Sequence, residues 1–497
     1  MLSASILGVE AVPVRVEVDV AFGLPSLTIV GLAGNAVQEA RERVRSAIRN
    51  TGYELPARRI TVNLAPADLP KQGTGYDLAI ATGILAASGQ LTAPRVSDTA
   101  LLAELALDGA LQPVPGAMAL VAAAREAGIS SAIVATGNVA EAASVPGITV
   151  HAATTFADAI GHLAAVRPLP PAPRTQLPPW AALPGVPDLA DILGQPLARR
   201  AIEIAVAGRH NLALTGPPGI GKTLFLRAAA GLLPPLEDDE ALEVSRIYSV
   251  AGLLDRRRPL LRNRPFRMPH HTISTPALVG GGPRLRPGEA SLAHRGLLVL
   301  DEALQFRSDA LEALREPLES GWISLARVEG AIALPARFSL LMAFNPCPCG
   351  WYGSGRRGCS CEDALRRRYR ARISGPLRDR IDLWVVMGEP GGGIERIGAN
   401  EPSTVVAERV AAAWARQRSR QGVANGELGV SELRTHAGLR VPVVAALEER
   451  ARTFGLSPRR THGVARVART IADLDGCPEI EEGHLHEALR YRWEEPA

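Results

Sequence analysis

The sequence predicts a multidomain α/β protein, with a parallel sheet between helices at its centre, an α+β domain before it and a helical domain after it. Its 497 residues exceed what one hydrophobic core supports, and roughly 150 residues per domain favours about three domains. Residues 167–187 contain eight prolines and little apolar periodicity, which is typical of a stiff linker. From 188 to 389, strand and helix patterns alternate as in a parallel α/β core.

The N-terminal segment carries strand, helix and hairpin signals in turn. An alternating apolar run at 12–20 predicts a strand, and the pattern at 35–50 predicts a helix. Asp108-Gly109 lies between apolar runs, which is a strong hairpin signal. We find no internal repeats. The predicted segments are an α+β domain at 1–165, a linker at 166–187, an α/β core at 188–395 and a helical lid at 396–497.

Composition limits the location and the partners. The net charge of +4 and the pI of about 8.9 are only mildly basic, so a nucleic-acid partner must be argued from local clusters. The longest uncharged stretch, 78–94, is shorter than the ~20 apolar residues of a spanning helix. The first ten residues lack the charged n-region of a signal peptide. We therefore expect a cytoplasmic protein without a membrane segment.

The clearest motif is a complete P-loop. An apolar run at 212–215 predicts a buried strand, and the residues after it form a glycine-rich loop that opens a helix. Glycines let backbone N–H groups surround the β-phosphate, Lys222 would reach the β and γ oxygens, and Thr223 would ligate Mg²⁺. Of 55 basic residues only Lys71 and Lys222 are lysine, which favours a specific need for an ammonium group. The predicted ATP-binding residues are Gly216, Pro217, Pro218, Gly219, Ile220, Gly221, Lys222 and Thr223.

A Walker B pattern follows about eighty residues later. The apolar run at 297–300 predicts another buried strand, which ends at Asp301 and Glu302. Asp301 would hold Mg²⁺ through water, and Glu302 would polarise the water that attacks the γ-phosphate. Acidic pairs at strand ends are common, so this prediction depends on the order and spacing after the P-loop.

Two further residues are predicted to complete the ATP site. A third buried strand, at 338–344, ends at Asn345, whose amide can hold the attacking water or contact the γ-phosphate, the role called sensor 1. Arg380 is predicted to be an arginine finger, which neutralises charge in the transition state at a neighbouring subunit's ATP. A finger in trans requires an oligomer. The alternative is a surface arginine paired with Asp379 or Asp382.

Arginine clusters supply the candidate DNA contacts. Residues 256–267 hold six arginines and no acidic residue, which suits phosphate contact. A hairpin predicted at 322–338 carries Arg327 near its tip, and a second basic run lies at 366–372. Each cluster could instead be a solvated face or a subunit interface. The predicted DNA contacts are Arg256, Arg257, Arg258, Arg262, Arg264 and Arg327.

Four of the five cysteines lie close together in the sequence. The pairs Cys347-x-Cys349 and Cys359-x-Cys361 frame a nine-residue, glycine-rich loop, which is flexible enough to bring four thiolates around one Zn²⁺. A reduced or redox-active cluster and plain packing are the alternatives. His270, His271 and His294 are interpreted as loop or core residues rather than as further ligands.

Six more runs give the sequence a specific resemblance that covers essentially the whole chain. They are MPHH at 268–271, VGGG at 279–282, PGEASLAH at 287–294, NPCPCG at 345–350, RISGPL at 372–377 and VARTIADL at 467–474. With the ATP motifs, they make the chain resemble the ComM/YifB family of magnesium-chelatase-like AAA+ ATPases. Ala303 and Gln305, just after Walker B, depart from the Leu and Glu that relatives often carry.

The resemblance implies both an activity and one more site residue. It implies a homo-hexameric, ATP-dependent DNA motor or helicase that drives branch migration when incoming single strands integrate by homologous recombination, as in natural transformation. Single-stranded or branched DNA and recombination proteins would be its partners. It also implies that Arg459 is the sensor-2 arginine of the lid, a role that the adjacent Arg460 could take instead.

The first domain resembles the Lon-protease fold without its catalytic residues. Gly75 stands where active proteases carry the nucleophilic serine, and Met118 stands where they carry the partner lysine. Acyl transfer has no nucleophile here, so we interpret the domain as a non-catalytic scaffold and Lys71 as a remnant of the motif or a structural cation.

The sequence therefore predicts an ATP hydrolase with ATP, Mg²⁺ and, at the cysteines, Zn²⁺ as cofactors, and without protease activity. One alternative is a magnesium-chelatase motor subunit, which would normally lack the Lon-like domain. A second alternative is a protein-remodelling AAA+ ATPase. An ATP-dependent peptidase is opposed by Gly75 and Met118.

Overall fold

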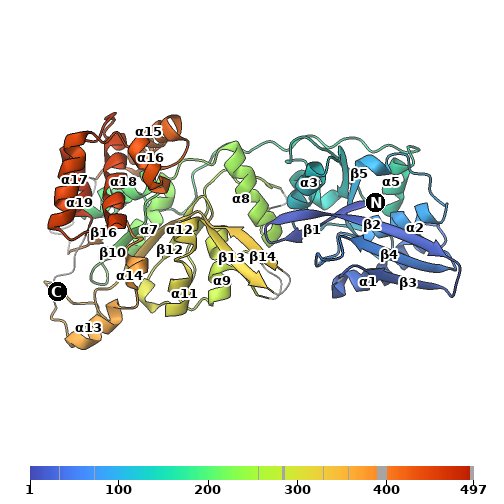
Figure 1. Ribbon diagram of the computed structural model, residues 1–497, viewed down its shortest axis with the longest axis horizontal. Helices are drawn as coiled ribbons and strands as arrows, with labels where there is room; N and C mark the ends of the chain where they lie inside the picture. Colours follow the sequence, from blue (N-terminus) through green and yellow to red (C-terminus); the bar gives the residue numbers. More distant parts are fainter. Residues whose placement is uncertain are drawn as a thin grey trace.

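The structure, a computed structural model, describes residues 1–497 except 33, 72, 256, 283–285, 328–329, 356, 389–399 and 493–497, and it leaves out the side chains at 35, 326–327 and 330–331. The described chain extends along one axis, with an N-terminal α/β domain at one end, helices at the other and a parallel sheet between them (Figure 1). The prediction of a mixed α/β chain with a parallel sheet and a helical C-terminal region is confirmed.

The N-terminal domain is built on a mixed sheet in the order β3-β4-β2-β1-β5-β8-β9. Antiparallel β1, β2 and β4 form its middle, and β3, β5, β8 and β9 join in parallel pairs. The Asp108-Gly109 turn joins a short antiparallel pair, so the predicted hairpin is confirmed. The elements are β1 (Leu2–Leu7), β2 (Glu10–Ala21), β3 (Ser26–Val30), α1 (Asn35–Asn50), β4 (Arg59–Ala65), α2 (Asp77–Ala87), β5 (Thr99–Leu102), β6 (Glu104–Leu105), β7 (Leu111–Gln112), α3 (Ala117–Glu126), β8 (Ser131–Ala135), α4 (Val139–Ala142), β9 (Thr149–Ala153) and α5 (Phe156–Leu163).

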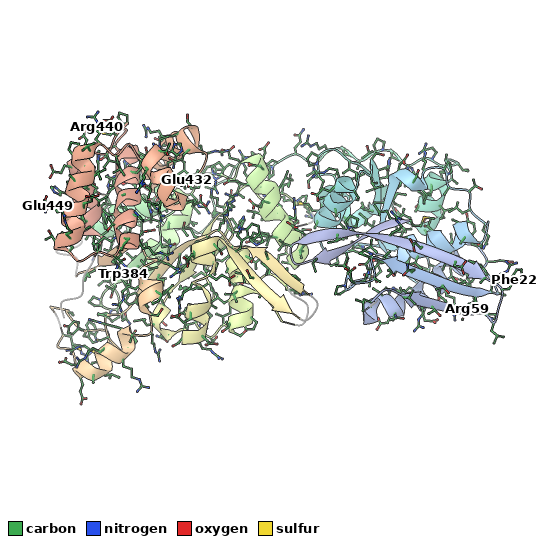
Figure 2. All side chains as sticks on the ribbon, viewed as in Figure 1. Phe22, Arg59, Trp384, Glu432, Arg440 and Glu449 are labelled. Carbon is green, nitrogen blue, oxygen red and sulfur yellow. The ribbon has the colours of Figure 1, made fainter. Side chains whose placement is uncertain are left out.

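Apolar periodicity explains which faces of this domain are buried. Val14 and Val16 alternate with exposed residues along β2, and helices α1 and α2 pack on the same core. Beyond the C-terminal end of β2 the apolar side chains are no longer buried, because Phe22, in the turn after the strand, is 88% exposed. Figure 2 shows Phe22 and Arg59 at the tip farthest from the C-terminal helices.

The proline-rich segment runs along the N-terminal domain before it reaches the core. The backbone N–H of Ala172 donates to Val150 O at 2.7 Å, so the segment pairs briefly with the β9 edge. Thr175 donates through its backbone N–H to Ala143 O at 3.2 Å. Pro prevents regular ladder pairing, and the rest of the segment accordingly has no helix or strand.

The central sheet has the order β11-β12-β15-β10-β16, and every pair in it is parallel. Strands β10, β12 and β15 are buried along their whole length, as expected for a sheet covered by helices on both faces. Because the strands are parallel, the loops that follow them meet at one edge. The elements here are α6 (Pro196–Gly208), β10 (Leu212–Thr215), α7 (Lys222–Ala228), α8 (Asp238–Ala251), β11 (Phe266–Arg267), α9 (Thr275–Val279), α10 (Glu289–Leu292), β12 (Leu297–Leu300), α11 (Ser308–Ala313), α12 (Pro317–Ser320), β13 (Trp322–Arg327), β14 (Gly330–Pro335), β15 (Ser339–Phe344), α13 (Asp363–Arg370), α14 (Gly375–Arg378) and β16 (Leu383–Val386).

The C-terminal helices share a hydrophobic core with the central sheet. Buried polar contacts fix their position: His210 Nε2 lies 2.7 Å from Thr470 Oγ1, and Trp414 Nε1 donates to Val206 O at 3.0 Å. Buried polar groups need such partners, so these contacts specify one packing.

No described helix is long and apolar enough to cross a membrane. The helices are α15 (Ser403–Gln421), α16 (Val430–His436), α17 (Val441–Thr453), α18 (Pro458–Leu474) and α19 (Glu482–Arg490).

Helix α8 joins the N-terminal domain to the core (Figure 1). It packs against α3, and the backbone N–H of Gly116 donates to Ser249 O at 3.2 Å. The Ser249 hydroxyl donates to the Glu141 carboxylate, which also accepts the backbone N–H of Met118 at 2.9 Å. The two parts are therefore connected by polar contacts as well as by the linker.

Candidate active site

The P-loop connects a buried strand to a helix, as the sequence predicts. Strand β10 ends at Thr215, and α7 begins at Lys222. Gly219 and Gly221 have φ of +81° and +91°, a left-handed conformation that favours glycine. A Cβ on Gly216 would lie 2.5 Å from Met387 O, so that position requires glycine for a different reason, which is close backbone packing against the segment after β16.

Lys222 lies inside the loop that its helix opens. Its Nζ donates to Gly216 O at 2.6 Å, Pro217 O at 2.7 Å and Asn345 Oδ1 at 3.0 Å. The residue is only 9% exposed. Burial lowers the pKa of Lys222 to about 8, although the carboxylates of Asp301 and Glu302 oppose that shift. The ammonium is thus desolvated and held at the position where the P-loop motif would bind phosphate.

The Walker B residues lie beside the P-loop because their strand is two places away in the same sheet. β15 pairs with both β10 and β12, which brings their carboxyl ends together. Thr223 Oγ1 donates to Asp301 Oδ2 at 2.6 Å, so the two predicted Mg²⁺ ligands are in direct contact. Hydroxyl and carboxylate oxygens are ligands that Mg²⁺ favours, and this pair fits the ion.

Glu302 has a backbone conformation that side chains rarely adopt. Its φ is +52°, and its N–H donates to Asp301 Oδ1 at 3.0 Å. The carboxylate is about half exposed, and its Oε2 lies 3.9 Å from His271 Nδ1. Strained backbone at a strand end often marks a functional position. The Glu302 carboxylate therefore lies beside His271, at the end of β12.

His271 lies beside Glu302, a contact that the sequence interpretation did not predict. It follows β11, whose carboxyl end lies at the same sheet edge as that of β12, and its ring also packs against Phe306. The MPHH run and the parallel order of the strands would have indicated this position. The prediction that His271 is a loop residue is confirmed, because it lies in a turn between β11 and α9.

Arg380 is held by a carboxylate on another element. It donates to the Glu319 carboxylate and, through Nη1, to Pro376 O at 2.7 Å, and its side chain is 8% exposed. The two neighbours named as alternative partners have other contacts: Asp379 accepts from Arg460 Nε at 2.9 Å, and Asp382 lies 3.4 Å from Arg492 Nη2. The carboxylate partner of Arg380 is therefore on α12.

Arg459 contacts the same carboxylate. Its Nη1 donates to Glu319 Oε1 at 3.3 Å, from the first turn of α18. The hydrogen bond with Arg380 is the main cause of the lowered pKa of Glu319, and Arg459 contributes in the same direction. One glutamate thus joins two arginines that the sequence analysis places in the ATP site, one from the core and one from the helical domain.

The four clustered cysteines converge, and their ligand atoms all lie within 4.8 Å of one another. Cys347 Sγ lies 3.4 Å from Cys349 Sγ and 3.6 Å from Cys359 Sγ. A tetrahedral site with Zn–S bonds of about 2.3 Å separates its sulfurs by about 3.8 Å, so the spacing fits a metal ion.

Backbone N–H groups point at the sulfurs of this cluster. Cys347 Sγ accepts from Tyr352, and Cys361 Sγ accepts from Cys349, each at 3.4 Å. Backbone hydrogen bonds, that of Trp351 first, lower the pKa of the Cys349 thiol, whereas burial raises the pKa of the Cys347 thiol to about 12. Such donors stabilise thiolates, which are the form that ligates metals. The cluster can therefore hold a metal ion.

The burial of Arg264 contradicts one predicted DNA contact. The residue is 3% exposed, its Nη2 lies 2.6 Å from Glu240 Oε2, and its guanidinium stacks 4.2 Å from the Trp414 ring centroid. A phosphate has no access to it, so the prediction that Arg264 contacts DNA is wrong. Its role is to join α8 to α15.

The other predicted DNA contacts divide into two groups. Arg257 and Arg258 are exposed, and Arg262 forms an ion pair of 3.5 Å with Asp238. Arg256 and the side chain of Arg327 lie outside the described residues. In the second basic run, Arg366 Nη1 donates to Cys361 O at 2.8 Å, so this run supports the cysteine loop.

The positions compared with a protease site are apolar or buried. A Cβ on Gly75 would have Val114 as its nearest neighbour, at 3.9 Å, and Met118 is 2% exposed. Lys71 is fully buried, and its ammonium donates to Pro66 O. The lysine is thus a structural cation that ties its loop to the end of β4.

Comparison with known families covers the chain in three parts. The family described as magnesium chelatase, subunit ChlI, matches 188–392, its C-terminal family matches 400–492, and the family described as subunit ChlI of Mg-chelatase matches 16–138.

Full-length relatives are also found. The chain is 45% identical to protein YifB of Salmonella typhimurium, over 98% of this chain and 95% of that protein. It is 42% identical to competence protein ComM of Haemophilus influenzae, over 99% and 96%. Similarity to the magnesium-chelatase 67 kDa subunit of Heliobacterium mobile is 28% and covers 32% of this chain and 28% of that subunit.

Proposed function

This chain belongs to the ComM/YifB family of magnesium-chelatase-like AAA+ ATPases, and from that premise we propose that it is an ATP-hydrolysing motor that works as a homo-hexamer on single-stranded or branched DNA in the cytoplasm. The observation that carries the ATPase part is the contact of P-loop, Walker B and Asn345 side chains at one sheet edge. ATP turnover by the purified chain tests it.

Each of the described site residues has its own role in the proposed hydrolysis reaction. The P-loop amides and Lys222 bind the phosphates, and Thr223 and Asp301 would hold Mg²⁺, which neutralises charge on the β- and γ-phosphates. Glu302 orients water for attack on the γ-phosphate and accepts its proton. Asn345 keeps Lys222 in place and contacts the water or the γ-phosphate. Arg459 acts as sensor 2.

In the assembled ring, a neighbouring subunit would supply one more positive charge to each ATP site. Arg380 reaches the ATP of the neighbouring subunit and stabilises the transition state there, which is the role of an arginine finger. This requires the Glu319 contact to lie at the rim of a subunit interface. AAA+ ATPases are typically oligomeric, which supports a ring. The Lon-like domain acts as a scaffold, because Gly75 and Met118 offer neither a nucleophile nor a base.

DNA is the proposed substrate because the full-length match includes a protein named for competence. The motor would drive branch migration when incoming DNA recombines, in concert with recombination proteins. Arg257 and Arg258 are exposed and suit phosphate contact, and Arg256, Arg262 and Arg327 complete the proposed path. For the cysteine cluster we propose Zn²⁺, which favours four thiolates in tetrahedral geometry.

A magnesium-chelatase motor subunit is the second candidate. Its support is the family match to the core, but chelatase relatives cover only about a third of the chain. A protein-remodelling ATPase shares the same ATP site and is the third. The three differ in what stimulates turnover, since only a DNA motor responds to DNA.

The deciding experiment measures ATP turnover with no DNA, with single-stranded DNA and with forked DNA. The Glu302→Gln variant, which should bind ATP without hydrolysing it, is the control. We expect DNA to stimulate the native chain severalfold and the variant to be inactive. If no DNA changed ATP turnover, the DNA motor would be rejected and the other two candidates would remain. If the Glu302→Gln variant hydrolysed ATP, the role of Glu302 would be rejected.

A further inference from the structure

The loop that carries the four cysteines begins at the ATP site. Cys347 follows Asn345 by two residues, and Asn345 Oδ1 accepts the Lys222 ammonium at 3.0 Å. Pro346, between them, accepts Arg370 Nε through its carbonyl at 3.1 Å. Any change in the position of Cys347 is therefore transmitted along two peptide bonds to a residue that contacts the P-loop lysine.

The same loop packs on the P-loop itself. A Cβ on Gly350 would lie 2.9 Å from Pro218 Cδ and 3.7 Å from Asn345 Nδ2, so the loop backbone is in close contact with the Pro218 ring there. Gly350 also has φ of +85°, which favours glycine. Tyr352 and Gly353 line a cavity of about 210 Å³ that Gly216 and Pro217 also line.

The loop has little regular structure to hold it in this position. The described residues between Asn345 and Glu362 lie in no helix or strand. Two guanidinium groups, those of Arg366 and Arg370, stack on the Tyr352 ring at 4.4 and 4.9 Å. Irregular loops this long carry a large conformational entropy, and a metal that joins four sulfurs removes much of it.

We propose that the cysteine cluster is a zinc site that holds Asn345 and the P-loop in their productive arrangement, so that ATP turnover depends on zinc occupancy. Zinc here is structural: four protein sulfurs fill its coordination and leave no position for a substrate. The inference rests on the proposed ATPase function, and it is independent of DNA. It predicts that the thiols act on the ATP site through Cys347, Gly350 and Pro218.

The test uses the full chain without DNA, so that a failed DNA assignment cannot affect it. Metal content is measured by mass spectrometry, ATP turnover by phosphate release, and local opening by hydrogen exchange at 216–223. Zinc is removed with a chelator that binds it far more tightly than Mg²⁺, and is then restored as zinc alone. Cys359→Ser/Cys361→Ser is the matching variant, and Cys477→Ser, outside the cluster, is its control.

We expect about one zinc per chain, at least about a tenfold loss of turnover on removal, faster exchange at the P-loop and recovery with zinc. The Cys359→Ser/Cys361→Ser variant should behave like the stripped chain, and Cys477→Ser should behave like the native one. Less than about a tenth of an equivalent of zinc, or full turnover and unchanged P-loop exchange after stripping, would overturn the proposal.

A second variant separates coupling from global unfolding. Gly350→Ala leaves every sulfur in place but forces the loop away from Pro218, so it should keep its zinc and still lose turnover severalfold. Exchange in α6 and α18, which pack in the core shared by the central sheet and the C-terminal helices, reports on the stability of the ATPase part and should not change. A Gly350→Ala chain with normal turnover would show that the loop does not act on the P-loop. An inactive native, zinc-loaded chain would instead reject the ATPase itself.

Discussion

Lys222 Nζ lies 3.0 Å from Asn345 Oδ1, and this hydrogen bond joins the start of α7 to the end of β15. The two residues are 123 positions apart in the sequence, and the parallel pairing of β10 with β15 brings them together. The amide orients an ammonium group that burial has already desolvated. Together with the donations to Gly216 O and Pro217 O, this contact holds the ammonium at the phosphate site.

Replacing Asn345 with Ala should slow hydrolysis more than it weakens ATP binding. The P-loop amides still hold the phosphates, but Lys222 loses an acceptor and the attacking water loses a contact. We expect turnover to fall about 100-fold, as when one preorganised polar group is removed, with less than about a tenfold change in ATP affinity. Single-turnover kinetics and titration with a fluorescent ATP analogue separate the two. An equal loss in both would mean that Asn345 only shapes the pocket.

ATP affinity should fall as the pH rises above about 8. The pKa of Lys222 is lowered to about 8 by burial, so the free protein loses this charge above that pH. Bound phosphates favour the ammonium form and raise its pKa, so binding then takes up a proton. Affinity should fall by up to about tenfold per pH unit between pH 8 and 10. Calorimetric titration across this range measures it.

The matched variant for this pH effect is Lys222→Arg, because a guanidinium stays charged throughout the range. It should bind ATP more weakly than the native chain, with a flat profile above pH 8. Phosphate monoesters lose their last proton near pH 6, so the nucleotide does not contribute. A native profile as flat as that of the variant would contradict the lowered pKa.

Glu319 and Arg380 should act as a unit. Glu319→Gln keeps the shape but removes the charge that anchors Arg380 and Arg459, so turnover of the assembled ring should fall about fivefold. Arg380→Ala should lower turnover about 1,000-fold, to a rate that single-turnover assays still measure. The double variant, Arg380→Ala with Glu319→Gln, should then have the same turnover as Arg380→Ala alone. Turnover of the two single variants and the double variant, at a protein concentration that maintains the ring, completes the cycle.

Mixing experiments show whether Arg380 acts in trans. Arg380→Ala subunits still carry intact P-loops, so they should poison native rings in proportion to their share of the mixture. Activity that follows only the native fraction would mean that Arg380 acts within its own subunit. Additive effects in the Glu319 cycle would mean that the ion pair is unrelated to the finger.

Arg264→Ala should destabilise the fold rather than weaken DNA binding. Removing the guanidinium leaves the Glu240 carboxylate largely buried without its partner, and breaking a buried pair costs about 3–5 kcal/mol. Denaturant unfolding measures this loss. Arg257→Ala is the contrast: that side chain is exposed, so stability should change by less than about 0.5 kcal/mol while DNA affinity falls. If Arg264→Ala instead weakened DNA binding without lowering the free energy of unfolding, Arg264 would be a DNA contact after all.

Features that depend on neighbours in the chain could be predicted from the sequence. Glycine spacing and an apolar run predicted the strand, loop and helix around Lys222, and periodicity predicted α1 with its observed bounds. Cysteine spacing predicted that four sulfurs could meet, and they do. In each case the residues that decide the structure lie within about one element of each other.

Only the tertiary structure decided which side chains meet across the core. Arginine composition could not tell the exposed Arg257 from the buried Arg264, because Glu240 and Trp414, which bury the latter, come from two separate helices. Nor could it find Glu319 beside Arg380 and Arg459, or Gly350 on the P-loop. Charge and burial depend on packing between distant segments, and local patterns carry no information about those partners.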